Sequence, residues 1–288
     1  MNLVILGLGY SAGFFARAAI AAGWQVTGTV RSAEKAGRLS RDGVHTLVFN
    51  GFAVSSRLAA AIAEANAVLV SAQPGEDGDP VLACLSAQLA AAPNLRWIGY
   101  LSTIGVYGDH GGAWIDESAP CRPGSARSTL RLATDEAWLR FGETSGKPVQ
   151  IFRLAGIYGP GRNAIVNLRD GTARRLVKPG QVFNRIHVDD IAGVLLASLA
   201  RPRNGAVYNL TDDEPAPPQD VVAFAAQLIG VEPPQEIAFD PALLSPMAAS
   251  FYGENKRVSN GLVKRELGYA FRYPSYREAL TAMAPDGG

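Results

Sequence analysis

Short apolar runs alternate with helix-like segments through the first 156 residues, and this alternation restricts the fold more than any other feature. The first apolar run is Leu3 to Leu6, and an alanine-rich stretch from Phe14 to Ala22 follows it. Most of the expected strands are apolar runs without clean polar alternation, which is typical of strands buried on both faces. The pattern predicts an α/β fold with a Rossmann-like, doubly wound parallel sheet covered by helices.

The same rhythm locates the other elements. Further strands are expected at residues 24–30, 46–49, 67–71, 97–101 and 149–153, and helices at 33–41, 56–65, 81–91 and 130–143. Beyond residue 156 the rhythm loosens, although a helix at 191–199, capped by Asp189 or Asp190, and a strand at 207–210 are expected. We predict an NADP(H)-binding domain over residues 1–156. Residues 157–288 would form mostly a smaller C-terminal substrate lobe, with segments near 180–210 returning to the sheet.

Composition and charge exclude several classes of function. Hydrophobic residues make up 48% of the 288 residues and charged residues 18%, so the chain can bury a large core. The net charge of +1 favours neither a nucleic acid nor an anionic membrane as partner. No run is long enough to cross a bilayer, and the N-terminus does not read as a signal peptide. The two cysteines and three histidines lack metal-ligand spacing, so we expect no metal and a cytoplasmic location.

A glycine-rich loop follows the first expected strand and opens the first helix. Its sequence, Gly7-Leu8-Gly9-Tyr10-Ser11-Ala12, fits the dinucleotide-binding pattern G-x-G-x-x-G/A. In this context the first glycine permits a tight turn, the second admits a diphosphate close to the backbone, and the alanine lets helix and strand pack closely. The N-terminus of the helix then offers amide groups to the phosphates. We predict that Gly7, Gly9, Tyr10, Ser11 and Ala12 bind the cofactor.

The residue after the second expected strand indicates which cofactor is bound. Arg31 stands where an acid that accepts a ribose 2′-hydroxyl would stand in an NAD-binding protein, and Ser32 follows it. A guanidinium is a donor with a fixed positive charge, so it suits a 2′-phosphate. We therefore predict a preference for NADP(H) over NAD(H). Sheet topology also places Ala72 and Gln73, at the end of the fourth strand, near the cofactor.

Three later strings resemble one known family. Residues 101–108 (LSTIGVYG), 153–161 (RLAGIYGPG) and 185–192 (RIHVDDIA) occur in the order found in extended short-chain dehydrogenase/reductases, the NAD(P)-dependent epimerase/dehydratase group. The resemblance implies that Thr103, with Ser102 beside it, forms a hydrogen bond with the reacting oxygen of the substrate. It also implies a tyrosine as general acid and base, with a lysine four residues later that lowers its pKa and holds the nicotinamide ribose.

That tyrosine and that lysine are both missing. Alignment of the acidic end of the family helix puts either Arg127 and Arg131, or Ser128 and Leu132, at their positions. Arg131 is able to replace the charge of the lysine, but a guanidinium is a poor proton donor. Other groups then become candidates. Tyr158, on the turn after the sixth strand, is one, and the loop residue His110 is another. Lys256 or Arg257 is also able to reach back to the cleft.

Two functions remain open from the sequence. The first is an NADP(H)-dependent oxidoreductase or an epimerase/dehydratase-like enzyme acting on a small polar substrate, working as a monomer or homodimer. The second is a catalytically impaired, NADP(H)-binding redox sensor or regulatory protein, which is what loss of the tyrosine and lysine would produce. A group with an exchangeable proton near the nicotinamide would favour the enzyme.

Overall fold

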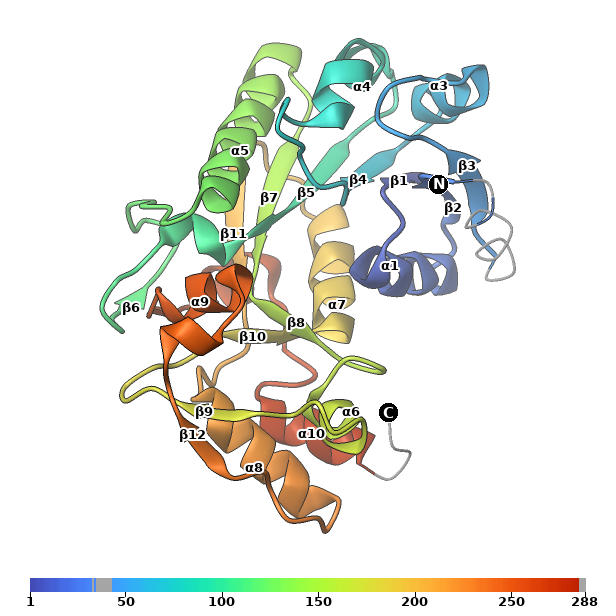
Figure 1. Ribbon diagram of the computed structural model, residues 1–288. Coiled ribbons are helices and arrows are strands. Elements are labelled where there is room, and N and C mark those ends of the chain that lie inside the picture. The colour runs from blue at the N-terminus through green and yellow to red at the C-terminus, as the bar shows by residue number, and fades with distance from the viewer. Residues whose placement is uncertain (33, 35–42, 285–288) are drawn as a thin grey trace.

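A seven-stranded parallel sheet forms the centre of the computed structural model, which describes residues 1–32, 34 and 43–284 (Figure 1). Its strand order is β11-β7-β5-β4-β1-β2-β3, so the chain winds outward in both directions from the β1/β4 pair. The strands are β1 (Asn2–Leu6), β2 (Gln25–Val30), β3 (His45–Val48), β4 (Ala67–Val70), β5 (Trp97–Thr103), β7 (Val149–Leu154) and β11 (Ala206–Leu210). The predicted doubly wound α/β fold is confirmed.

Both faces of the sheet are buried because successive side chains of the central strands β1, β4, β5 and β7 enter opposite apolar cores. Leu3 and Ile5 of β1 pack in one core, and Val4 and Leu6 pack in the other. Helices α1 (Tyr10–Ala21) and α7 (Val188–Leu199) cover the first face. Helices α3 (Ser56–Ala63), α4 (Pro80–Ala91) and α5 (Ala126–Ser145) cover the second. The helix expected at 33–41 lies outside the described residues, apart from residue 34.

Polar caps fix where several helices begin. The Ser55 hydroxyl accepts from Leu58 N before α3, and one carboxylate oxygen of Asp79 accepts from Val81 N and Leu82 N before α4. Ser125 caps α5 by accepting from Ser128 N, so this helix starts four residues earlier than the expected Leu130. Such caps satisfy amides that have no partner inside the helix.

The expected cap of α7 is wrong. The helix begins at Val188, and the cap is His187, whose Nδ1 accepts from Asp189 N at 3.2 Å. Asp189 therefore lies in the first turn, as does Asp190. The buried Asp190 carboxylate is turned toward the C-terminal segment, where it accepts from the Tyr269 hydroxyl and from the backbone amides of two nearby residues.

A smaller group of elements lies beyond the carboxyl edge of the sheet (Figure 1). Its core is formed by α6 (Ala164–Arg169), α8 (Pro218–Leu228) and α10 (Tyr276–Met283). Three short parallel pairs join it: β8 (Gly156–Tyr158) with β10 (Arg185–His187), β9 (Arg175–Val177) with β12 (Glu236–Ala238), and β6 (Trp114–Ile115) with β13 (Arg257–Val258). The remaining elements of the described residues are the 3₁₀ helices η2 (Ile104–Tyr107) and η3 (Pro241–Leu243), the π-helix η4 (Val263–Leu267) and helix α9 (Pro246–Tyr252).

Candidate functional site

The glycine loop leaves β1 at the point where the strand order reverses, which is where open parallel sheets bind ligands. Gly7 has φ +97°, a backbone conformation that favours glycine. Its amide donates to Thr29 Oγ1 at 2.9 Å. A Cβ on Gly7 would stand only 2.7 Å from the Ala72 amide nitrogen of the neighbouring loop. The turn is therefore tight against the end of β4, as the sequence pattern requires.

The second glycine leaves an open space at the start of α1. A Cβ on Gly9 would meet nothing within 4 Å, and Gly9 caps α1 without any side chain on the first amides. Helices α3, α4 and α5 have a side-chain cap in the same position. Ala12 is fully buried against the sheet, and Ser11 is also buried. The first turn of α1 is thus able to take an anionic ligand, because its amides carry the positive end of the helix dipole.

The other residues expected at the cofactor lie along the same edge of the sheet. Arg31 and Ser32 follow β2 and are exposed. Ala72 and Gln73 follow β4, where Ala72 is half-buried and Gln73 is exposed. The Tyr10 hydroxyl donates to the Pro160 carbonyl at 2.9 Å, and this bond holds the turn after β8 beside the glycine loop. Because all seven strands are parallel, their carboxyl ends bring these segments together.

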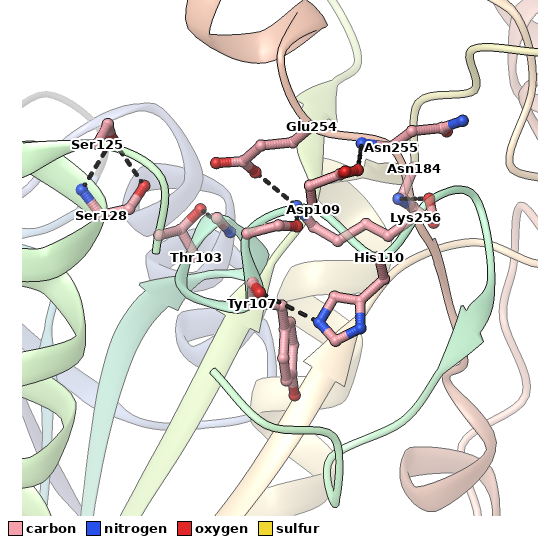
Figure 2. A network of polar contacts seen from close by, with 12 residues as sticks. Thr103, Tyr107, Asp109, His110, Ser125, Ser128, Asn184, Glu254, Asn255 and Lys256 are labelled. Atoms are coloured by element: carbon pink, nitrogen blue, oxygen red, sulfur yellow. Dashed lines mark hydrogen bonds and ion pairs between the residues drawn. The ribbon is translucent and has the colours of Figure 1, made fainter. Parts of the chain in front are cut away.

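Two hydroxyl groups lie on either side of Gly105, just after the end of β5. Thr103 caps η2, and its Oγ1 accepts from Gly105 N at 3.1 Å. Ser128, from the first turn of α5, approaches the same glycine. A Cβ on Gly105 would stand 3.2 Å from Ser128 Oγ and 3.3 Å from Thr103 Oγ1. Figure 2 shows the Thr103 and Ser128 side chains close together.

Ser102 points into the protein instead. Its hydroxyl donates to Asp135 Oδ1 at 2.5 Å, and Arg153 Nε donates to Asp135 Oδ2 at 3.1 Å. Asp135 is fully buried, and burial raises the pKa of its carboxyl while the bonds from Ser102 and the charge of Arg153 oppose that rise. This network joins β5, α5 and β7 beneath the site, so the hydroxyl of Ser102 is engaged away from a substrate.

The sequence left two alignments of the start of α5 open, and the structure places one residue from each of them near the end of β5. Arg131 donates to the Leu101 carbonyl, and its guanidinium lies 5.1 Å from the centre of the Tyr100 ring. Leu132 packs against the apolar core, and Arg127 is exposed. A positive charge from Arg131 therefore reaches the end of β5, and Ser128 is the hydroxyl beside Thr103. Neither alignment places a phenol there.

The aromatic and imidazole alternatives are engaged elsewhere. Tyr107 is fully buried, and its hydroxyl donates to Asn209 Oδ1 at 2.9 Å. Tyr158 packs in the core of the smaller lobe with its hydroxyl directed at the Ser275 carbonyl, and burial raises its pKa. His110 Nε2 lies 3.1 Å from the Tyr107 carbonyl oxygen. The role of Tyr158 as a catalytic residue stays a prediction.

A charged pair from the C-terminal segment completes this region. Lys256 Nζ donates to the Gly108 carbonyl at 2.7 Å and to Glu254 Oε2 at 2.6 Å. Gly108 directly follows η2, so the lysine does reach back to the end of the turn that Thr103 begins (Figure 2). The sequence suggested Lys256 or Arg257 for such a role but gave no reason to single out Glu254, because no local pattern links these residues to β5.

This arrangement defines a class: a parallel dinucleotide-binding sheet with a threonine of an S-T-x-x-V-Y-G string at the end of β5. The chain belongs to the NAD dependent epimerase/dehydratase family, whose model matches residues 3–211.

In the parts of the chain that the structure describes, no three histidine, cysteine or acidic side chains are grouped to hold a metal ion. Nor is any described helix both long and apolar enough to cross a membrane.

Three known proteins are similar to this chain. A structure of a functionally unknown conserved protein from Silicibacter pomeroyi DSS is 47% identical with a TM-score of 0.89, over 99% of this chain and 98% of that one. Protein YeeZ of Escherichia coli K12 is 30% identical over 95% of this chain and 96% of its own length. A 3-diazoavenalumate denitrifying reductase from a Streptomyces species is 27% identical, over 58% of each chain.

Proposed function

We propose that this protein is an NADP(H)-dependent oxidoreductase that acts on a small polar substrate. The observation that carries the proposal is that an open, uncapped helix N-terminus at Gly9 and a pair of hydroxyl groups at Thr103 lie on one edge of one sheet. The first suits the diphosphate of a dinucleotide, and the second suits the oxygen of a substrate group whose carbon is oxidised or reduced. The Streptomyces relative is itself named a reductase.

The residues at the glycine loop fit a nicotinamide dinucleotide, which is the kind of cofactor that the family name implies. The amides of Gly9, Tyr10 and Ser11 would take the diphosphate, and Arg31 with Ser32 would take the 2′-phosphate of NADP(H). Ala72 and Gln73 would line the same crevice. When bound, the nicotinamide supplies or accepts a hydride at its C4.

The chain's own groups would then orient the reacting oxygen. Hydroxyls from Thr103 and Ser128 are able to donate to, or accept from, an oxygen placed between them. Arg131 places a permanent positive charge at the Leu101 carbonyl, where it would support the ribose in the manner expected of the missing lysine. The two hydroxyl groups and the guanidinium are held in place before the reaction begins. They would therefore stabilise a transition state in which negative charge grows on that oxygen.

A redox sensor is the second candidate, and the lack of a phenol beside Thr103 favours it. Such a protein would bind NADP(H) and change its contacts with a partner, but it would not consume the cofactor. Steady NADPH oxidation in the presence of carbonyl compounds separates the two functions. Persistent turnover supports the enzyme, and tight binding without turnover supports the sensor.

Cofactor preference is tested by titrating NADPH and NADH fluorescence with the wild type and Arg31→Ala. Loss of a charge-assisted contact to a 2′-phosphate is expected to weaken NADPH binding by about 10- to 100-fold, from about 1.5–3 kcal/mol, and to leave NADH binding nearly unchanged. Arg57→Ala, at an exposed position in α3, is the matched control and should change neither affinity. Equal affinities of the wild type for both cofactors would contradict the NADP(H) preference.

A further inference from the structure

Lys256 has a buried side chain whose ammonium group contacts a backbone carbonyl and a carboxylate. Its side chain is only 7% exposed, and that of its partner Glu254 is 17% exposed. Two of the three ammonium N–H groups are used, one by the Gly108 carbonyl and one by Glu254. A buried ammonium is kept charged at a considerable desolvation cost, so this pair requires an explanation beyond a surface ion pair.

The pair lies between the two segments that carry the hydroxyl groups of the site. On one side, Gly108 ends the tight turn that Thr103 begins. On the other side, Glu254 Oε1 is 3.5 Å from where a Cβ on Gly124 would stand, next to the Ser125 cap of α5. Figure 2 shows Glu254 and Lys256 extending from the C-terminal segment toward the Thr103 side.

The backbone that carries Lys256 is held in place by several bonds. The Asn184 amide donates to the Lys256 carbonyl at 3.0 Å and accepts from Val258 N at 2.8 Å. Asn255 N donates to Asp109 Oδ1 at 2.7 Å. These contacts tie the segment to the loop after η2, and the bond from Lys256 Nζ to the Gly108 carbonyl holds the ammonium at the end of the turn that Thr103 begins.

We propose that Lys256 is the proton donor of this site and protonates the substrate oxygen in place of the absent phenol. The inference rests on the proposed oxidoreductase function. As a carbonyl carbon of the substrate accepts a hydride from the dihydronicotinamide, the C=O π bond becomes an electron pair on oxygen. An N–H bond of Lys256 then breaks and an O–H bond forms, leaving an alcohol and a neutral amine. Solvent reprotonates the amine from the side of Glu254.

Acid strength separates lysine from the arginines nearby. A free lysine ammonium has a pKa of about 10.4, close to the value of about 10 for a tyrosine phenol, whereas a guanidinium lies at about 12.5 or above. A lysine thus replaces the phenol as an acid, while Arg127 and Arg131 do not. Two carboxylates of the loop after η2, those of Asp109 and Asp116, are also unsuited to the role. Hydrogen bonds lower the pKa of Asp109 and Asp116, so both stay ionised near neutral pH.

The position of the ammonium is tested without turnover. The chain contains few lysines, so protein labelled with ¹³C and ¹⁵N at the lysine side-chain termini gives a sparse NMR spectrum, in which Lys256→Arg assigns the Lys256 signal. Adding NADP⁺ is expected to shift this signal. Lys147, which donates to the Ala92 carbonyl remote from the site, is the internal control and should not move. An unmoved Lys256 signal in cofactor-saturated protein would overturn the proposal.

The chemical role of Lys256 is tested by measuring NADPH consumption with 9,10-phenanthrenequinone and with a set of aldehydes and 2-oxo acids. Lys256→Met is expected to lower kcat by about 100-fold or more, within the range for general acid catalysis. Lys256→Arg keeps the charge and the donors but should remain at least 10-fold slow. Methylamine is expected to rescue Lys256→Ala, and Lys147→Met should resemble the wild type.

The outcomes separate the two proposals. If the wild type turns over and Lys256→Arg keeps the wild-type kcat, the charge alone is required and the proton-donor role is wrong, while the oxidoreductase function stands. Failure of methylamine to rescue a folded Lys256→Ala protein leads to the same conclusion. If the wild type consumes no NADPH with any of these compounds, the oxidoreductase function fails and the role of Lys256 fails with it.

Discussion

The two ends of the site differ in how closely they follow their family. At the glycine loop, the turn at Gly7, the open space at Gly9 and the buried Ala12 all match what a dinucleotide requires. At the start of α5, Thr103 is retained, but the phenol and the lysine are replaced by Arg127 and Arg131 or by Ser128 and Leu132. Cofactor binding is set by backbone geometry and has few solutions, whereas a proton donor can come from any element that reaches the substrate.

The buried network beneath α5 shows that this helix keeps its structural role even without the phenol. We expect Asp135→Asn to lower the free energy of unfolding by about 3–5 kcal/mol, because the buried Arg153 guanidinium would lose its charge partner. The control is Glu136→Ala on the same helix, whose pair with Arg140 is exposed and should contribute less than about 1 kcal/mol. Urea unfolding measures both. Similar losses in the two variants would mean that the network does not hold α5 against the sheet.

The sequence predicted the sheet well because its central strands β1, β4, β5 and β7 are mostly apolar runs that contact both cores. It also predicted the glycine loop, since a turn, an open backbone and a tight helix contact each restrict the residue type at a fixed spacing. The start of α5 was misplaced by four residues because the apolar run at Leu130 outweighed the Ser125 cap. The contact of Lys256 with Gly108 spans 148 residues, so its geometry depends on tertiary packing that no local pattern encodes.

Gly9 provides the sharpest test of the cofactor end. We expect Gly9→Val to weaken NADPH binding by at least 100-fold, or about 2.7 kcal/mol, because its side chain would fill the space before α1. Stability should change little, since Gly9 has an extended backbone with φ −102° and a Cβ there meets nothing. Gly7→Val is the contrasting variant. Its positive φ and its contact with Ala72 should lower stability as well.

The NADPH affinity and the stability of each glycine variant are measured on the same preparation, by NADPH fluorescence and by thermal unfolding. A Gly9→Val protein that folds normally and still binds NADPH with wild-type affinity would show that the diphosphate does not approach this glycine. The expected difference between Gly7 and Gly9 therefore separates a glycine needed for the turn from one needed for the ligand.

His187 lies between the glycine loop and the smaller lobe, and the free-energy change expected from its substitution is smaller than those expected for Asp135→Asn in unfolding and for Gly9→Val in NADPH binding. The ring is buried, and Nδ1 accepts from Asp189 N, so the neutral ring carries its proton on Nε2. A Cβ on Gly159 would stand 3.3 Å from that Nε2 and 2.9 Å from the Tyr10 hydroxyl oxygen. Burial lowers the pKa of His187 to about 4, with Asp189 opposing the shift and Arg272 adding to it.

The pH dependence of the free energy of unfolding follows from this lowered pKa of His187. Between about pH 6.5 and pH 4 the unfolded chain binds a proton at this histidine and the folded chain does not, so its contribution to stability is complete above pH 6.5 and falls as the pH drops. We expect the wild type to lose about 1–2 kcal/mol more than His187→Asn between pH 7 and pH 5, measured by urea unfolding. Asparagine is able to keep the helix cap without titrating. His45→Asn, at an exposed position in β3, should follow the wild type. If His187→Asn shows the wild-type slope instead, His187 is not held neutral, and the seam between the glycine loop and the smaller lobe tolerates a charge.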